Sequence, residues 1–372
     1  MKHLCSRIGI DLIHVTHSKG FAAMKKEFDF LVFIGRFQPF HLGHLSVVKS
    51  GLEQAERLII LCGSSHRPRS VRNPWTVDER AEMIYGSIDE ADRKRVHVMP
   101  LMDIVYNDEA WVSNVQMTVN GVVTAHHGIP HSKAKIGLIG HSKDHSSYYL
   151  NLFPQWGAVD VENFNEIGAT QVRGAFFSAE SESYLERSAA EHLPSNVLTK
   201  MQDFATSDSF NHIRDEHDFV GKYKSAWEGS PYPPTFVTVD AVVVQSGHVL
   251  MVERKARPGK GLMALPGGFV GANEKLMDAC LRELREETRL KIPAPVIQGS
   301  IKHQMVFDDP HRSDRGRTIT HAFYIELAPN SNLPKVKGGD DAKHARWVPL
   351  ADLDPAQIFE DHYFIIKELA GM

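Results

Sequence analysis

The chain has 372 residues, of which 42% are hydrophobic and 24% are charged, and its formal net charge is −4 at pH 7. This composition is typical of a folded globular protein, and the length suffices for two domains of about 150 residues each. A slightly acidic chain creates no broad basic field, so nucleic acid is not a favoured partner. Every apolar run is shorter than the roughly 18 residues that a membrane span requires, which also argues against a membrane partner.

The cysteine content and the start of the chain suggest a location and a boundary. Cys5, Cys62 and Cys280 are odd in number and far apart. They indicate neither a disulfide framework nor a zinc cluster, so we expect a reducing, cytoplasmic environment. Residues 1–27 are predicted to be an N-terminal tail, and Met24, just before the first strand-like segment, is the expected natural start.

The first informative stretch is residues 35–44, Gly-Arg-Phe-Gln-Pro-Phe-His-Leu-Gly-His, which follows the apolar run Phe30–Ile34. Apolar residues then recur at helical spacing from Leu45 to Glu56, so the order is strand, glycine-flanked turn and helix. This order brings backbone N–H groups and two histidines to the positive end of a helix, where phosphate binds well. His41 and His44 can stabilise the charge that develops in phosphoryl or nucleotidyl transfer. The alternative is that one histidine only caps the helix.

Strand-like and helix-like segments alternate from Phe30 to about Phe177. This alternation predicts an α/β fold, a Rossmann-like domain whose parallel sheet has helices on both faces, and we assign residues 28–190 to it. Gly35, Gly63 and Gly140 each end a strand, so their loops are expected at one rim of the sheet. The further expected elements are strands at Leu58–Gly63, Val96–Pro100 and Lys135–Gly140, and helices at Thr76–Ile88, which opens with a Thr-x-x-Glu capping pattern, and Trp111–Val123.

Residues 35–44 resemble the Gly-x-Phe-x-Pro-x-His-x-Gly-His signature of the nucleotidyltransferase superfamily, and their opening is similar to archaeal-type nicotinamide mononucleotide (NMN) adenylyltransferases. Residues 63–65, 73–76 and 79–80 resemble the second-strand loop and following helix of that family, and residues 139–144 resemble its later nucleotide-binding loop. Residues 167–173, Ile-Gly-Ala-Thr-Gln-Val-Arg, stand where the superfamily carries Ile-Ser-x-Thr-x-x-Arg, with Gly168 in place of the serine.

This resemblance implies transfer of AMP from ATP to NMN, with Mg²⁺ screening the phosphates and without a covalent nucleophile. It gives catalytic roles to His41, His44 and Arg173, whose guanidinium would offer a forked donor to the β- and γ-phosphates. Trp111 is a candidate to stack on the nicotinamide ring, although a Trp on a helix more often belongs to a core. The residues expected to bind the nucleotide substrates are Gly35, Arg36, Phe37, Gln38, His41, His44, Asn73, Trp111, Gly140, Asp144, Thr170 and Arg173.

Residues 191–234 are predicted to be a helical connector that ends in a stiff Pro-rich linker, and residues 235–372 a second domain. The second domain opens with a strand pair, Thr235–Gln245 and His248–Arg254. The helical stretch Lys275–Arg289 places Glu283, Glu286 and Glu287 on one face. Like charges packed in this way destabilise a helix unless divalent cations neutralise them, and the alternative is a solvated acidic face.

From Gly268 the pattern Gly-x₅-Glu-x₇-Arg-Glu-Leu-x-Glu-Glu resembles the Nudix box, with Arg289 in place of the glycine that ends the helix. The resemblance implies an α/β/α sandwich in which Mg²⁺ or Mn²⁺, held by the Gly268 carbonyl, Glu283, Glu286 and Glu287, activates a water that cleaves a nucleoside pyrophosphate. Glu283 and Glu286 are the catalytic candidates. Two arginines, Arg254 and Arg257, are candidate phosphate contacts. The charged loop 308–315 is predicted to be mobile and is a candidate for the catalytic base.

Together the two domains resemble bifunctional NMN adenylyltransferase/ADP-ribose pyrophosphatases, which implies small-molecule substrates, namely ATP, NMN and ADP-ribose. NADH and oxidised nucleotides are alternative substrates of the second domain. Some Nudix-like domains act as ligand sensors, so a domain that binds ADP-ribose without cleaving it is the alternative to a hydrolase. For the first domain, the rivals are pantetheine-phosphate adenylyltransferase and cytidylyltransferases. The sequence leaves open whether the chain forms a homo-oligomer.

Overall fold

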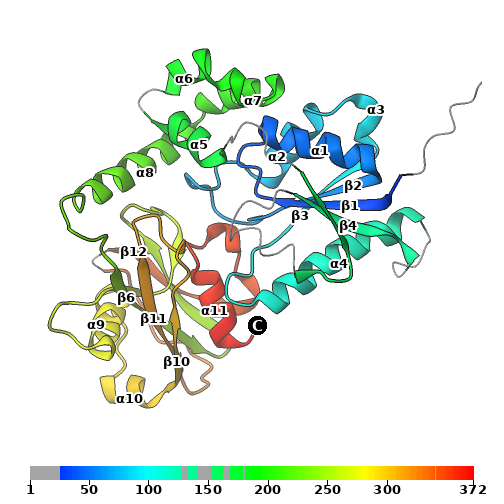
Figure 1. Cartoon of the computed structure of the whole chain (residues 1–372). Coiled ribbons are helices and arrows are strands. Elements are labelled where there is room, and N and C mark those ends of the chain that lie inside the picture. Colours follow the sequence, from blue (N-terminus) through cyan, green and yellow to red (C-terminus); the bar gives the residue numbers. More distant parts are fainter. Residues whose placement is uncertain (1–25, 128–132, 141–151, 162–167, 179–180, 340) are drawn as a thin grey trace, which may run out of the picture.

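The computed structural model describes residues 26–127, 133–140, 152–161, 168–178, 181–339 and 341–372. Within these residues the chain forms two lobes, each built on its own sheet (Figure 1). We call the part from β1 to α8 the first lobe and the part from β6 to α11 the second lobe. The expected N-terminal tail lies almost entirely outside the described residues.

The first lobe contains a five-stranded sheet with the order β3-β2-β1-β4-β5, in which every neighbouring pair is parallel. Its strands are β1 Phe28–Gly35, β2 Ala55–Cys62, β3 Val96–Pro100, β4 Ile136–Gly140 and β5 Gly157–Asp160. Its helices are α1 Leu42–Gln54, α2 Val77–Gly86, α3 Glu90–Arg93, α4 Asp108–His127, α5 Ala169–Phe177, α6 Ser181–Arg187, α7 Ser195–Ala205 and α8 Asp208–Ser225.

Helices cover both faces of this sheet, as the alternating pattern predicted. One face packs on residues of α1, α2 and α5, and the other packs on the valines of α4. Sheet residues alternate between these two clusters along β1, where Leu31 and Phe33 face one side and Phe30 and Val32 the other. The Rossmann-like α/β prediction is therefore confirmed.

The strands end at one rim, and a buried arginine holds this rim together. The N–H of Gly63 donates to the carbonyl of Gly35 over 2.8 Å. Arg80 on α2 is 1% exposed and donates to the carbonyls of Arg36 and Gly63, each at 2.7 Å. A single buried guanidinium therefore fixes the loops that follow β1 and β2.

The segment expected to be a connector has a second role. Helix α7 and the first half of α8 contribute Met201, Phe204, Phe210 and Ile213 to the hydrophobic cluster of the first lobe. These side chains pack around Phe176 of α5, whose ring centroid lies 5.0 Å from that of Phe210. The helices therefore complete the core of the first lobe before α8 leads to the second lobe (Figure 1).

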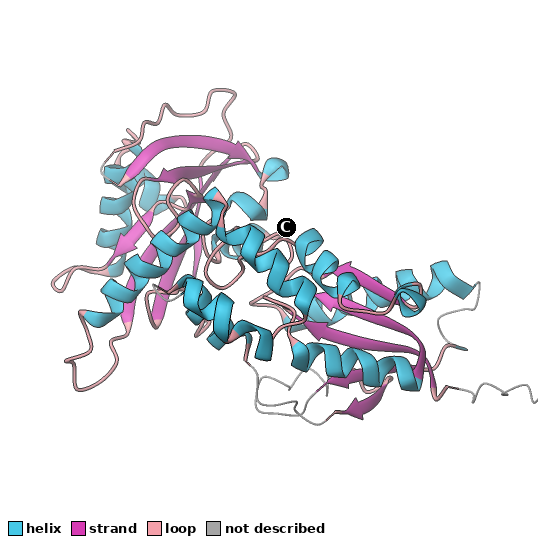
Figure 2. Cartoon of the chain, turned by 90° about the horizontal axis from the view of Figure 1, so that it is seen from above, coloured by secondary structure: helices cyan, strands magenta, loops and turns pink. Residues whose placement is uncertain are grey.

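The second lobe contains a mixed sheet with the order β10-β11-β6-β7-β12, in which β11 and β6 are parallel and the other pairs are antiparallel. Helix α9 packs on one face and α11 on the other, which confirms the α/β/α sandwich. Its strands are β6 Phe236–Gln245, β7 His248–Arg254, β8 Met263–Ala264, β9 Gly267–Phe269, β10 Ile301–Phe307, β11 Thr318–Glu326 and β12 Ala342–Pro349; its helices are α9 Leu276–Thr288, α10 Ala294–Gly299 and α11 His362–Ala370. Figure 2 shows both lobes from above.

Residues with positive φ values occur at a turn and at a helix end of the second lobe, and each has a clear physical cause. Ser246 and Gly247 have φ values of 49° and 74°, the paired positive values of the tight turn that joins antiparallel strands β6 and β7. Arg289, which replaces a glycine of the Nudix pattern, has φ 53° and ψ 28° and ends α9 in the same left-handed conformation that glycine would adopt. The substitution therefore leaves the helix terminus in place.

No helix within the described ranges is long and apolar enough to cross a membrane.

We predict that Arg80→Met lowers the free energy of unfolding of the first lobe by about 2–4 kcal/mol, because it removes charge-assisted hydrogen bonds and leaves buried carbonyls without donors. Urea unfolding of the full chain measures this. Arg57→Met is the matched control, because Arg57 makes one exposed hydrogen bond to the carbonyl of Lys94. It should change the free energy by less than about 0.5 kcal/mol. An equal loss in both variants would contradict the role of Arg80.

Candidate functional sites

The two histidines of the first motif cap α1 reciprocally. The backbone N–H of His44 donates to Nδ1 of His41, and the N–H of His41 donates to Nδ1 of His44, each over 3.3 Å. Their rings stack with centroids 3.6 Å apart. This cap explains why α1 begins at Leu42, three residues before the expected start. The capping alternative and the phosphate-binding hypothesis are therefore compatible.

Reciprocal capping also fixes the tautomer of both rings. Because each Nδ1 accepts a hydrogen bond, the proton of each neutral imidazole is on Nε2. Nε2 is then a hydrogen-bond donor, which is the form that a phosphate oxygen requires. The cap that starts α1 thus determines which ring nitrogen of each histidine accepts a hydrogen bond and which one donates.

Three arginines of the first lobe influence one another strongly. Burial, followed by repulsion from Arg36 and Arg72, lowers the pKa of Arg173 to about 10. Burial, followed by repulsion from Arg72, also lowers the pKa of Arg36. Arg173 donates to the carbonyl of Gln38 over 2.7 Å and to Oγ1 of Thr170 over 3.1 Å. The guanidinium groups of Arg36 and Arg173 create a positive field beside the histidine cap, which suits a polyphosphate.

Other residues of the first motif have structural positions. The side-chain amide of Gln38 is buried and pairs with the backbone of Trp75 at 2.8 and 3.0 Å. Phe37 is 1% exposed and packs edge-on against His44, and its ring lies so close to Gly35 that a β-carbon there would be 2.8 Å away. These residues position the arginines and histidines; their side chains face the core.

The remaining predicted nucleotide contacts are dispersed. Asn73 lines the cavity between the lobes, together with Arg36. Trp111 on α4 is half-buried against the core and packs on Phe153 at 6.2 Å, as its alternative interpretation suggested. Gly140 ends β4 at the expected rim, and its carbonyl accepts from Val161. Asp144 lies outside the described residues.

Two of the predicted metal-binding glutamates of α9, Glu283 and Glu286, are bridged by Arg282. Its guanidinium donates to Glu283 over 2.8 Å and to Glu286 over 3.1 Å, and also pairs with Glu274. Glu287 instead accepts from the N–H of Gly267 over 3.0 Å. Across the described residues, no three His, Cys, Asp or Glu side chains are already grouped to hold a metal ion.

The donor set nevertheless fits a divalent cation. Carboxylate and carbonyl oxygens are the ligands that Mg²⁺ and Mn²⁺ prefer. A β-carbon at position 268 would lie 2.5 Å from Oε1 of Glu283, so only glycine lets the backbone approach this carboxylate. Burial raises the pKa of Glu283, and raises the pKa of Glu287 to about 8. A cation would relieve this cost by stabilising the charged forms.

The two upstream arginines differ in their surroundings. Arg254 lines a cavity of about 180 Å³ with Gly268 and Glu287, and its guanidinium lies 4.0 Å from the ring centroid of Phe359. Arg257 also lines this cavity, and it forms an ion pair with Asp215 of α8 at 2.6 Å. Both arginines therefore remain candidate phosphate contacts, and Arg257 in addition links the two lobes.

The charged loop 308–315 is attached to the second lobe through a buried ion pair of Arg312. Arg312 forms a bidentate ion pair with Asp361, both distances being 2.9 Å, and both side chains are buried. Burial raises the pKa of Asp361, but Arg312 and His362 lower it more, so the net shift is downward. One of the charges of the loop, that of Arg312, is therefore compensated inside the protein.

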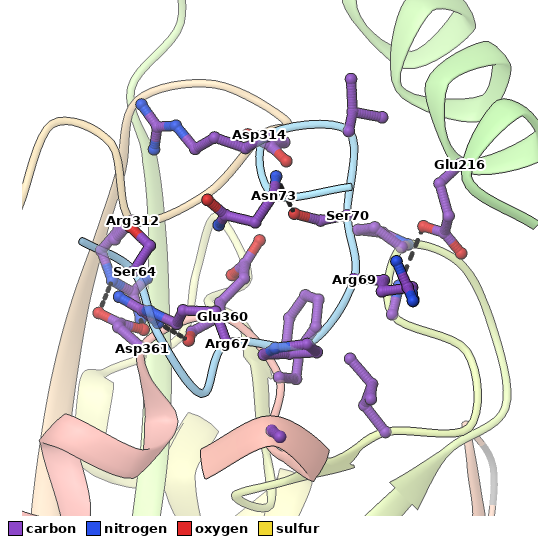
Figure 3. Close-up of a pocket in the computed structure, with 18 of the residues that line it drawn as sticks. Ser64, Arg67, Arg69, Ser70, Asn73, Glu216, Arg312, Asp314, Glu360 and Asp361 are labelled. Carbon is purple, nitrogen blue, oxygen red and sulfur yellow. Dashed lines mark hydrogen bonds and ion pairs between the residues drawn. The ribbon is translucent and has the colours of Figure 1, made fainter. Parts of the chain in front are cut away.

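This loop and residues beside it contact the first lobe (Figure 3). Tyr106 donates to Asp361, and its ring packs on Phe307 at 4.9 Å. Arg72 donates to the carbonyl of His311 over 2.8 Å. Arg67 donates to the carbonyl of Glu360. The loop that precedes α2 thus binds the second lobe directly.

Comparison with known proteins gives matches to both lobes and to the whole chain. The cytidylyltransferase-like family model matches residues 32–120 and the NUDIX domain model matches residues 234–369. A bifunctional NMN adenylyltransferase/ADP-ribose pyrophosphatase from Francisella tularensis, solved in complex with AMP and a manganese ion, is 34% identical. The match covers 92% of this chain and 99% of that one, with a TM-score of 0.82. The chain belongs to this bifunctional family.

Single-activity relatives match each half of the chain. A nicotinamide/nicotinic acid mononucleotide adenylyltransferase from Acinetobacter baylyi is 37% identical over 192 residues, which are 51% of this chain and 94% of the relative. An ADP-ribose pyrophosphatase from Methanocaldococcus jannaschii is 36% identical over 132 residues, 36% of this chain and 71% of the relative. The sequence resemblance to the bifunctional family is therefore confirmed.

Several important residues were not found from the sequence. Arg72 belongs to the arginine group of the first site, and Tyr106 and Asp361 join the lobes, but none of them lies in a motif that we used. Arg80 lies in residues 79–80, which were included in the family resemblance, but no role was predicted for it. Arg72 could have been found because it directly precedes residues 73–76, which resemble a segment of the nucleotidyltransferase family.

We predict that His44→Ala lowers the turnover of the first site about 10²- to 10³-fold, because a donor to the developing phosphate charge is lost. It should also cost about 1 kcal/mol of stability, because α1 loses its reciprocal cap. Steady-state kinetics and thermal unfolding measure the two effects. Ser207→Ala is the matched control: it removes the cap of α8, where Ser207 accepts from Phe210, and should reduce stability alone. Normal turnover in His44→Ala would exclude the catalytic role.

We predict that the affinity of the second site for Mg²⁺ rises with pH up to about 8, the pKa of Glu287, and then levels off. The neutral carboxyl must lose its proton to bind metal, so affinity should rise by about tenfold per pH unit below that pKa. Without metal the sign is opposite: the raised pKa stabilises the fold at acid pH, and this contribution is lost as the pH rises through about 8. Calorimetric titration at pH 6, 7, 8 and 9 measures the affinity. Glu287→Gln should flatten the profile, and a flat wild-type profile would contradict the assignment.

Proposed function

We propose that the chain is a bifunctional enzyme of NAD metabolism. The first lobe transfers AMP from ATP to NMN, giving NAD and pyrophosphate. The second lobe hydrolyses ADP-ribose to AMP and a sugar phosphate. The observation that carries this proposal is the relationship over nearly the whole chain to the bifunctional enzyme of Francisella tularensis, together with the retention of both sets of motif residues.

In the first reaction, a 5′-phosphate oxygen of NMN forms a bond to the α-phosphorus of ATP. The bond from that phosphorus to the bridging oxygen breaks, and pyrophosphate leaves with the electron pair. No protein nucleophile is required, so the side chains act by positioning and electrostatics. We assign His41 and His44 as donors to the reacting phosphate, and Arg173 with Arg36 as the cations that stabilise its charge.

In the second reaction, water forms a bond to one phosphorus of the pyrophosphate and the P–O bond of the bridge breaks. A divalent ion supplies Lewis acidity and lowers the pKa of water when it is bound. Glu283, Glu286, Glu287 and the Gly268 carbonyl would hold it, and we expect Mg²⁺ or Mn²⁺. Arg254 would bind a substrate phosphate, because its guanidinium lies in the same cavity as Glu287.

A pair of variants separates the two activities. Glu286→Gln should abolish ADP-ribose hydrolysis, because it removes a charged metal ligand, and should leave NAD synthesis within about twofold of wild type. His44→Ala should do the reverse. Product formation from ATP plus NMN, and from ADP-ribose alone, is measured by chromatography with Mg²⁺ present.

Two results would change the proposal. If the wild-type chain makes no NAD, the first activity is excluded and pantetheine phosphate and CTP-dependent acceptors become the substrates to test. If ADP-ribose binds but stays intact, the second lobe is a sensor.

A further inference from the structure

Two cavities adjoin at the boundary between the lobes. The larger, of about 820 Å³, lies between the loop 64–76 and α8 of the first lobe and three loops of the second lobe (Figure 3). The smaller, of about 180 Å³, contains Gly268 and Glu287 of the Nudix site. Arg312, Phe359 and Glu360 line both cavities. The Nudix site therefore borders the space between the lobes.

The smaller cavity cannot enclose a whole pyrophosphate substrate that carries two riboses. Sites for ligands of this size measure about 300–1,000 Å³. The cavity at Glu287, about 180 Å³, is below this range, and the interlobe cavity is within it. A substrate with its pyrophosphate near Glu287 must extend beyond the Nudix cavity, and the wall shared at Phe359 and Glu360 leads to the interlobe space.

The interlobe cavity offers buried acceptors that lack donors. Oδ1 of Asn73, from the first lobe, and Oε1 of Glu360, from the second, are buried, and no hydrogen-bond donor of the described chain reaches either. Both side chains point into the space between the lobes in Figure 3. Oε1 of Glu216 on α8 is also buried without a hydrogen bond, although Arg257 lies 3.6 Å away. Leaving a buried acceptor unsatisfied is unfavourable, and a ligand with donor groups would remove this cost.

The chemistry of this lining selects the kind of ligand. A hydroxyl group can donate a hydrogen bond to a carboxylate oxygen or to an amide oxygen. A ribose carries two adjacent hydroxyl groups. The side chains of Arg67, Arg69 and Lys260 also line the cavity, which disfavours an apolar ligand. The arrangement therefore suits the ribose of a phosphorylated substrate.

We propose that the interlobe cavity receives a ribose of the pyrophosphate substrate of the Nudix site, with its hydroxyl groups donating to Asn73 and Glu360. This inference rests on the proposed hydrolase function of the second lobe. It makes the adenylyltransferase lobe a contributor to substrate binding by the hydrolase.

The test is the kinetics of ADP-ribose hydrolysis by the full chain. Asn73→Ala should raise KM for ADP-ribose about tenfold and change kcat by less than about twofold, because one hydrogen bond of binding is lost. Asn73→Asp, which keeps the shape but adds a negative charge facing Glu360, should also raise KM. Asn120→Ala is the matched control, because Oδ1 of Asn120 is likewise buried without a partner but lies on α4, outside the cavity. It should leave KM unchanged, and thermal unfolding verifies that all variants fold.

Competitive inhibition by ADP identifies which ribose is bound. If the terminal ribose occupies the cavity, Asn73→Ala leaves the inhibition constant of ADP unchanged; if the nucleoside ribose does, this constant also rises about tenfold. Either result supports the proposal. Unchanged KM values in both Asn73 variants overturn it, while hydrolysis by the wild type still supports the proposed function.

If instead the wild type does not hydrolyse ADP-ribose, the proposed function fails and the inference is decided by calorimetric binding of ADP-ribose. About tenfold weaker binding by Asn73→Ala than by Asn120→Ala supports it, and equal binding overturns it.

Discussion

The structure depends most on the buried carboxylate of Asp361. This group accepts a bidentate ion pair from Arg312 and a hydrogen bond from Tyr106 of the other lobe. A buried charge is stable only when it is paired and hydrogen-bonded, and here the two partners come from two segments that are distant from Asp361 in the sequence. Asp361 therefore fixes the loop 308–315, the start of α11 and the contact between lobes at once. The walls of both cavities depend on this fixation, because Arg312 lines each of them.

The two sites differ in how they compensate the negative charge of a phosphorylated substrate. The first site presents cations, Arg36 and Arg173, whose charges are only partly compensated, so the protein itself supplies the positive field. The second site presents acidic groups, and burial raises the pKa of Glu287 to about 8, a cost that a bound cation would relieve. Polyphosphates are strongly anionic, and both solutions provide the missing positive charge. At the first site the positive charge comes from side chains of the protein, whereas at the second site it must come from a bound metal ion.

Local patterns predicted local structure well. The Thr76–Glu79 capping box, the Ser246-Gly247 turn and the Nudix helix depend on neighbours within a few residues, and all three formed as expected. The fold class followed from the alternation of such elements. Long-range partners were not predictable in this way: Tyr106 and Asp361 are 255 residues apart in sequence. The same limit applies to loop 308–315: the partner of its Arg312 is Asp361, 49 residues away, so this buried ion pair was not predicted. The domain boundaries and the catalytic roles stay predictions.

The reciprocal cap of α1 has a consequence for the variation that this enzyme can tolerate. His41 and His44 each accept a backbone hydrogen bond at one ring nitrogen, which leaves the proton on the other. Under the proposed function, folding and chemistry would therefore use the same two rings. Asparagine or serine could replace a cap but would not present a donor at the same distance, and a cation such as lysine could face phosphate but could not accept from the backbone. A substitution that preserved only one of the two roles would then impair the other.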